Sequence, residues 1–107
     1  MKLIKLSGVT FEGRQRNIAK LSIGDKLQVK AIKNNPYDSH CVEIFKSNMS
    51  VGFIPKGENV SIFNDFVSRG IKYYATVYSI KGGGSGYSYG ITINLQKWNV
   101  NIAKESL

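Results

Sequence analysis

The chain has 107 residues, of which 15 are lysine or arginine and 7 are aspartate or glutamate, and its formal net charge is +8. This length predicts one domain with a single hydrophobic core. So strong a positive charge favours a polyanionic partner, and three classes compete at this point: nucleic acid, an anionic membrane surface and an acidic protein.

The same composition excludes several kinds of site. The single cysteine can form no internal disulfide, and with only one histidine it cannot complete a zinc site. No apolar run approaches the roughly 20 residues of a membrane-spanning helix, and the first residues lack the apolar core of a signal peptide. We therefore expect a cytoplasmic protein with no metal, no cofactor and no membrane partner.

The first part of the chain predicts a strand followed by a helical turn. Apolar residues lie on both faces of the extended segment 2–11, which indicates a strand in the centre of a curved sheet. Gly8 within it invites a bulge or a close approach of another backbone. A polar break follows at 12–17. The residues expected to hold a short turn of helix on the core after this break are Ile18, Leu21 and Ile23.

A tight corner, Asn34-Asn35-Pro36-Tyr37-Asp38-Ser39, separates two strand-like runs at 26–33 and 41–45. Proline fixes its own φ, while asparagine and aspartate bond the local backbone, so the corner is expected to be rigid. Turn chemistry alone explains it as a connection between strands. Its content also indicates binding, because Tyr37 offers a flat ring and Asp38 offers two acceptor oxygens. A ring beside a carboxylate suits a sugar hydroxyl with a base attached.

The second half of the chain predicts a hairpin, one helix and two long strands. A connection at 46–49 leads to a strand at 50–54, and an amphipathic helix then continues up to Gly70. We expect the apolar stripe of this helix to belong to the core. Its members are Val60, Ile62, Phe63, Phe66 and Val67. The last strands are expected at 72–80 and 89–98, and the inward residues of the second are Ile91, Ile93 and Leu95.

The glycine-rich stretch 81–88 joins these two strands. It lacks the Gly-Lys-Ser/Thr sequence and the following helix of a phosphate-binding loop, so a hairpin loop explains the glycines better. Lys81, Tyr87 and Tyr89 place a charge and two rings there, the composition with which proteins bind single-stranded nucleic acid without reading its sequence. The alternative is a solvent-exposed hairpin tip.

The residues that support catalysis in other proteins form no recognisable set here. His40 stands alone beside the corner, and Cys41 has no neighbouring base, so we assign Cys41 to packing. The carboxylates show no paired spacing for metal ions; they are Asp25, Asp38, Glu43 and Asp65. We expect a protein that is not an enzyme.

Four motifs occur in an order and spacing similar to those of the HIRAN domain family. They are Gly8-Val9-Thr10-Phe11-Glu12-Gly13-Arg14-Gln15, Leu21-Ser22-Ile23-Gly24-Asp25, the corner Asn34-Asn35-Pro36-Tyr37-Asp38-Ser39, and Val51-Gly52-Phe53-Ile54-Pro55-Lys56 leading into Glu58-Asn59. The resemblance extends from Gly8 to about Gly90. It implies an OB-like small β-barrel that binds the free 3′ end of single-stranded DNA, usually beside a helicase or nuclease module. A helicase or nuclease is accordingly a candidate partner protein.

The resemblance also implies roles for individual residues. Phe11 matches a ring that stacks on a base, and Lys56 matches a basic residue that contacts terminal phosphates. Thr10 departs from the family, because its DNA-binding members often have arginine at this position. Arg14, and as a weaker candidate Arg16, are expected to supply the missing charge.

These observations predict one function and leave one alternative open. The leading hypothesis is a non-catalytic module for single-stranded DNA. In it, Asp38 accepts the hydrogen bond of a terminal 3′-hydroxyl, Tyr37 stacks on a base and Asn35 positions the corner or the sugar. Competition by RNA is left open. The alternative is a protein-interaction module that kept the HIRAN fold and lost end binding, which Thr10 favours.

The expected fold is mainly β (α+β), an OB-like six-stranded β-barrel with one amphipathic helix and a short helical turn. The domain is expected to span 1–98, and 99–107 to form a C-terminal tail. The expected DNA contacts are Phe11, Arg14, Asn35, Tyr37, Asp38 and Lys56, with Lys81, Tyr87 and Tyr89 as a second set in the hairpin loop.

Overall fold

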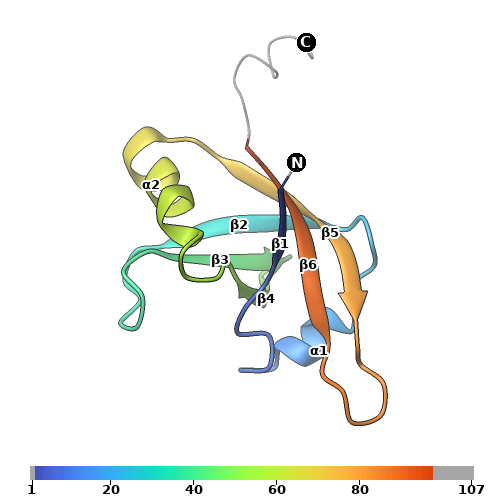
Figure 1. The fold of residues 1–107 in the computed structure, drawn as a ribbon. Helices are drawn as coiled ribbons and strands as arrows, with labels where there is room; N and C mark the ends of the chain where they lie inside the picture. The colour runs from blue at the N-terminus through green and yellow to red at the C-terminus, as the bar shows by residue number, and fades with distance from the viewer. Residues whose placement is uncertain (1, 98–107) are drawn as a thin grey trace, which may run out of the picture.

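The computed structural model describes residues 2–97, which form six strands and two helices (Figure 1). In chain order these are β1 (Lys2–Lys5), α1 (Arg14–Ile18), β2 (Lys26–Ile32), β3 (Cys41–Lys46), β4 (Met49–Phe53), α2 (Asn59–Arg69), β5 (Tyr73–Lys81) and β6 (Gly90–Lys97). The domain is mainly β, as the sequence predicts. The expected last residue of the final strand, Trp98, and the expected tail 99–107 lie outside the described residues.

The strands form one antiparallel sheet in the order β1-β6-β5-β2-β3-β4. Its two edges meet just past β1, where Ser7 and Phe53 form an isolated bridge. The N–H of Ser7 donates to the carbonyl of Phe53 over 2.9 Å, and the N–H of Phe53 donates to the carbonyl of Ser7 over 3.0 Å. Because an isolated bridge and not a strand ladder joins the two edges, the sheet is a curled half-barrel. The predicted OB-like six-stranded architecture is confirmed.

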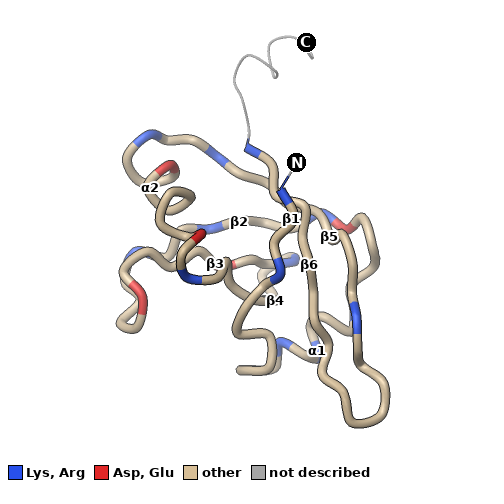
Figure 2. The backbone as a smooth tube through the Cα atoms, viewed as in Figure 1, with Lys and Arg blue, Asp and Glu red and all other residues tan. Residues whose placement is uncertain are grey.

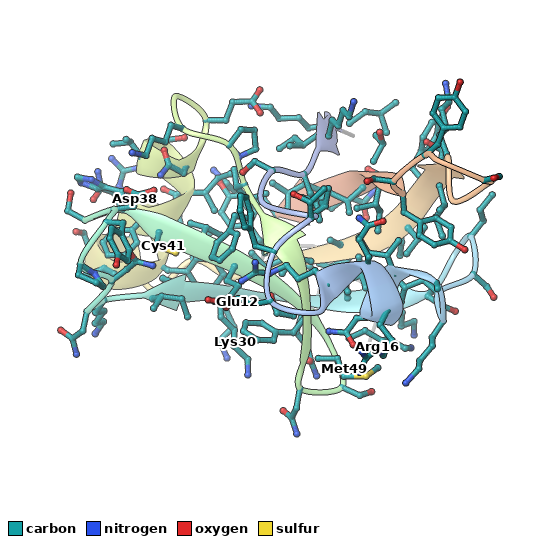
Figure 3. The ribbon with its side chains drawn as sticks, turned by 90° about the horizontal axis from the view of Figure 1, so that it is seen from below. Glu12, Arg16, Lys30, Asp38, Cys41 and Met49 are labelled. Atoms are coloured by element: carbon teal, nitrogen blue, oxygen red, sulfur yellow. The ribbon has the colours of Figure 1, made fainter. Side chains whose placement is uncertain are left out.

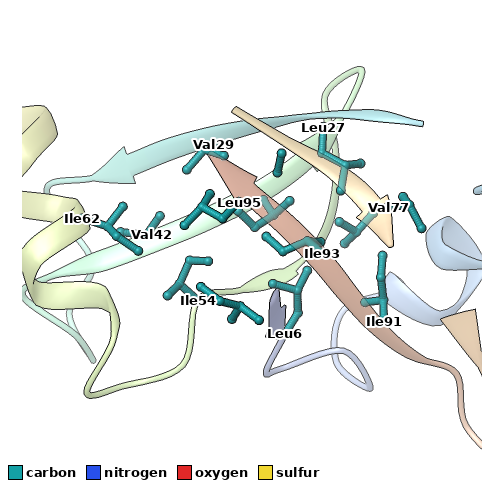
Figure 4. Packing of buried hydrophobic residues seen from close by; sticks show 14 of the residues in the cluster. Leu6, Leu27, Val29, Val42, Ile54, Ile62, Val77, Ile91, Ile93 and Leu95 are labelled. Carbon is teal, nitrogen blue, oxygen red and sulfur yellow. The ribbon is translucent and has the colours of Figure 1, made fainter. Parts of the chain in front are cut away.

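Alternating side chains of the strands fill the interior of this sheet (Figure 4). On β6, the side chains of Ile91, Ile93 and Leu95 are at most 4% exposed, as their period-two spacing predicts. Ile62 of α2 lies beside Val42 at one end of the cluster (Figure 4). The core is thus continuous from the sheet to α2, and it holds α2 next to the corner between β2 and β3.

The predicted amphipathic helix is α2, and it ends where the sequence predicts. Gly70 adopts a left-handed φ of 63°, which glycine tolerates better than other residues. Val60 and Val67 are 43% and 44% exposed, so the predicted core stripe is wrong for these two valines. The reason is that α2 packs at one end of the half-barrel and leaves one flank in solvent. Neither α1 nor α2, the helices of residues 2–97, is long and apolar enough to cross a membrane.

The first strand is shorter than predicted and lies at an edge of the sheet. β1 ends at Lys5, and the chain leaves the sheet after Ser7 because Gly8 adopts a φ of 66°. A Cβ atom on Gly8 would lie 2.9 Å from the ring of Phe53, so the close approach predicted at Gly8 involves a side chain rather than a backbone. The edge position leaves Leu3 45% exposed, which corrects the prediction of a central strand.

The helical turn α1 begins at Arg14, inside the segment predicted as a polar break. Ile18 is fully buried, as predicted, but Ile23 is 71% exposed, so its predicted place in the core is wrong. Ile23 lies in a turn that Ser22 and Asp25 close with two hydrogen bonds, of 3.1 Å and 2.8 Å. This turn directs the side chain of Ile23 to solvent.

Candidate nucleic-acid interface

Hydrogen bonds from one side chain hold the corner between β2 and β3. Asn35 Oδ1 accepts a bond from the N–H of Tyr37 over 2.8 Å and another from the N–H of Asp38 over 3.0 Å. Asparagine commonly forms this pattern in turns. The backbone is therefore fixed without any contribution from the ring of Tyr37, whose residue is 88% exposed.

Asp38 anchors the corner to the start of α2. Its Oδ1 accepts a bond from the N–H of His40 over 3.0 Å, and its Oδ2 accepts a bond from Asn59 Nδ2 over 2.9 Å. Asn59 is 2% exposed and also donates to the carbonyl of His40 over 2.9 Å. Each carboxylate oxygen can accept from two donors, so neither oxygen of Asp38 is saturated by these bonds.

Asn59 is the supporting residue that the sequence analysis missed. It stands in the fourth motif of the family resemblance, yet the sequence assigns it no role. The available signal was an asparagine at the first position of a predicted helix, where side-chain amides commonly bond nearby backbone groups. That signal does not reveal its partner Asp38, which precedes it by 21 positions.

Four of the predicted site residues line one pocket, which we call the corner pocket; they are Asn35, Tyr37, Asp38 and Lys56. The pocket has a volume of about 260 Å³, and its other walls come from Ser7, Cys41, Val42, Phe53 and Ile54. Lys56 is exposed and forms no ion pair with any residue in the described range. The volume is near the small end for ligand pockets, so it suits one nucleoside fragment rather than a longer ligand.

Cys41 lies beside Asp38 and lines this pocket (Figure 3). It is 2% exposed, and Asn35 Nδ2 donates to its Sγ over 3.5 Å. Burial raises the pKa of the thiol, and the charges of Glu43 and Asp38 raise it further. Cys41 is therefore held in its neutral form, which agrees with a packing role. Within residues 2–97, no group of three or more histidine, cysteine or carboxylate side chains is arranged to hold a metal ion.

Arg14 is buried, and its side chain supports the surrounding structure instead of facing a ligand. It is 5% exposed, and its Nε donates to Ser50 Oγ over 2.9 Å. Its Nη2 lies 3.4 Å from a carboxylate oxygen of Glu12 and 3.7 Å from one of Glu43. A guanidinium has five N–H groups, and these contacts leave little capacity for a phosphate. The expected phosphate contact by Arg14 is corrected accordingly.

The remaining donors of Arg14 hold the loop that carries Phe11. Nη1 donates to the carbonyls of Gly8 and Phe11 over 3.1 Å and 3.3 Å, and the guanidinium lies 4.5 Å from the centre of the Phe53 ring. Phe53 in turn lines the corner pocket. Phe11 itself is 66% exposed and lies outside the lining of that pocket. Arg14 thus fixes Phe11 on a loop next to the pocket.

In the hairpin between β5 and β6, Tyr87 and Lys81 are exposed, whereas hydrogen bonds fix the backbone of Tyr89. The N–H of Tyr89 donates to Gln15 Oε1 over 2.6 Å, and Gln15 Nε2 donates to the carbonyl of Tyr89 over 3.0 Å. Tyr89 is half-buried, whereas Tyr87 is 77% exposed. Of the three residues predicted in this loop, two face solvent and one ties the hairpin to α1.

The structure does not bring all predicted contacts into one site. The corner lies at one side of the domain and the β5–β6 hairpin at another, with the loop after β1 between them (Figure 1). Lysine and arginine positions occur on the loop before α2, on β1 and on β5 (Figure 2). The positively charged positions are therefore spread over several elements rather than gathered at the corner.

The family model of the HIRAN domain matches residues 3–97 of this chain. A crystal structure of a protein from Lactobacillus plantarum is similar in fold, with a TM-score of 0.69 and 13% sequence identity, and the match covers 90% of this chain and 93% of that chain. At this identity, the similarity shows the fold alone. No curated protein matches the sequence significantly.

Proposed function

The chain belongs to the HIRAN domain family, and we propose that it binds the free 3′ end of single-stranded DNA in the corner pocket. This family is known for binding nucleic acid, and single-stranded DNA in particular. HIRAN domains are binding domains, so the proposed activity is recognition rather than catalysis. The observation that carries the proposal is the placement of Tyr37, Asp38 and Lys56 around one small pocket.

Selection of an end follows from the carboxylate of Asp38. A terminal 3′-hydroxyl donates a hydrogen bond to an acceptor position that the corner leaves free. A 3′-phosphate or an internal phosphodiester brings negative charge to the same carboxylate and is repelled. The group that attracts the end therefore disfavours the interior of a strand.

The rings and the lysine supply affinity without reading sequence. The exposed ring of Tyr37 stacks on the terminal base, and Phe11 on the neighbouring loop stacks on the next one. Lys56 contacts a phosphate, and the nearby start of α2 adds a favourable helix dipole for an anion. Base identity is expected to matter little, because every base has a face that stacks.

Fluorescence anisotropy with single strands of one sequence tests the proposal. The strands end in a 3′-hydroxyl or a 3′-phosphate, and a circular strand serves as the control without an end. We expect the 3′-hydroxyl strand to bind most tightly. Equal binding of all three would overturn end recognition. An RNA strand of the same sequence measures how far the 2′-hydroxyl is tolerated.

The variant Asp38→Asn tests the residue assignment, because it keeps an oxygen for the N–H of His40 and removes the charge. We expect weaker binding of the 3′-hydroxyl strand and a smaller advantage over the 3′-phosphate strand. Equal loss on both strands would refute the role of Asp38.

One observation favours the alternative of a protein-interaction module. Thr10 replaces the arginine common in DNA-binding members, and Arg14 is buried, so of the two arginines expected to supply this charge only Arg16 is exposed. Such a module would show no salt-sensitive binding to any of the strands. If binding is found, a helicase or nuclease in another chain is the partner that we propose to use the recognised end.

A further inference from the structure

A second hollow, which we call the outer hollow, lies on the solvent face of β1, β6 and β5. It has a volume of about 310 Å³ and is lined by Lys5, Tyr78, Ser79, Lys81, Gly90 and Thr92. Only Lys81 among these was expected to contact nucleic acid. The lining contains two lysines, one tyrosine and the hydroxyl groups of Ser79 and Thr92, and no acidic residue.

Strand pairing explains how these residues gather on one face. Lys5 pairs with Thr92, and Thr92 pairs with Ser79, so the three form a row across the sheet. Lys81 pairs with Gly90 in the next row on the same face. The isoleucines on either side of Thr92 along β6 are buried, so this face points to solvent.

An irregularity in β5 adds the aromatic ring. The register against β6 shifts between Val77 and Ser79, so Tyr78 is an extra residue in the strand. Such bulges re-aim side chains, and here Tyr78 joins Ser79 at the hollow and is 51% exposed. Gly90 has no side chain to fill the space beside them. The fold therefore places an exposed ring next to two lysines.

The chemistry of the outer hollow fits a nucleotide. Lys5 and Lys81 are exposed, and neither forms an ion pair with any other residue of the described chain. Ammonium and hydroxyl groups bind phosphate oxygens, and the face of Tyr78 accepts a stacked base of any identity.

The outer hollow and the corner pocket adjoin the same short segment of chain. Lys5 lines the outer hollow and Ser7 lines the corner pocket. Leu6 between them points into the core and is 4% exposed, so Lys5 and Ser7 both face outward. Two residues of extended chain span about 7 Å. A strand that leaves the corner pocket can therefore pass directly to the outer hollow.

We propose that the outer hollow binds an upstream nucleotide of the single strand whose 3′ end occupies the corner pocket. Lys5 and Lys81 bind its phosphates, and Tyr78 stacks on its base. The inference rests on the proposed function and adds a second binding site and a minimum strand length to it.

The test compares thymidine strands of about 3 and about 12 nucleotides that carry a free 3′-hydroxyl, because sites of this fold cover about 4 to 16 nucleotides. The double variant Lys5→Gln/Lys81→Gln is expected to weaken binding of the long strand only. Its salt slope should fall by about 1.4, or about 0.7 for each lost phosphate contact. Tyr78→Ala should weaken binding of the long strand by about five-fold or more.

The matched control is Lys46→Gln/Lys72→Gln, which removes the same charge from lysines outside both hollows. An equal loss in this control, or an equal loss for short and long strands, overturns the proposal. So does a wild-type protein that binds the long strand no better than the short one. Failure of the proposed function would give a different result, because the short strand would then bind equally well with a 3′-hydroxyl and with a 3′-phosphate. A length-dependent loss in the double variant would still support the outer hollow.

Discussion

Arg14 and Lys56 are both cations that the sequence assigns to phosphates, and the fold treats them in opposite ways. Arg14 is 5% exposed and meets the carboxylates of Glu12 and Glu43, whereas Lys56 is exposed on the rim of the corner pocket. The difference shows that a basic residue in a binding motif can stabilise the structure of the site instead of contacting the ligand.

The same division separates the other residues of the interface. One set braces the site from inside, and its members are Arg14, Glu43, Ser50 and Asn59. The other set is exposed beside it, and its members are Phe11, Tyr37 and Lys56. Changes in the bracing set are expected to lower stability, while changes in the exposed set are expected to alter binding alone.

The largest effect is expected from Arg14→Ala. Removing Arg14 takes the cation from the largely buried carboxylate of Glu43, which keeps its hydrogen bond from Ser50, and the expected loss is about 3 kcal/mol in the free energy of unfolding. Urea denaturation measures it. The control is Arg16→Ala, an exposed arginine of the same helix, which should change stability by no more than about 0.5 kcal/mol. Equal stabilities of the two variants would contradict the division into a bracing set and an exposed set.

Asn59→Ala comes next. It leaves the carbonyl of His40 and an oxygen of Asp38 without their buried donor, which is expected to cost about 1 to 3 kcal/mol of stability. Because Asp38 also loses its orientation, the preference for a 3′-hydroxyl over a 3′-phosphate should narrow. Ser61→Ala, on the exposed side of the same helix, should change neither quantity. An undiminished end preference in Asn59→Ala would show that Asp38 needs no such support.

Tyr37→Ala is expected to affect binding and not folding. The residue is 88% exposed, so the melting temperature should stay near that of the wild type. Loss of one stacked base should weaken binding by about 1 to 3 kcal/mol in an anisotropy titration. Unchanged affinity, or a large loss of stability, would contradict its place in the exposed set.

Lys56→Gln is expected to give the smallest effect. The slope of the logarithm of affinity against that of salt concentration should fall by about 0.7, equally for 3′-hydroxyl and 3′-phosphate strands. Titrations at several salt concentrations measure this slope. A loss confined to the 3′-hydroxyl strand would instead place Lys56 in end recognition.

The candidate site was only partly predictable from the sequence. The corner was recognised because proline, asparagine and aspartate limit the backbone locally. The partner of Asp38 was not recognised, because Asn59 reaches it from a distant helix. The bulge that exposes Tyr78 also escaped prediction, since a register shift depends on how β5 pairs with β6.

The sequence by itself determined the local features of this protein. The hairpin between β3 and β4, where Ser47 and Asn48 adopt positive φ, and the end of α2 at Gly70 follow from preferences of a few adjacent residues. Only the tertiary structure decided which cation is buried. Glu43 and Ser50 reach Arg14 from strands that lie 29 and 36 positions further along the chain. Burial is set by such contacts between distant segments, which no local pattern records.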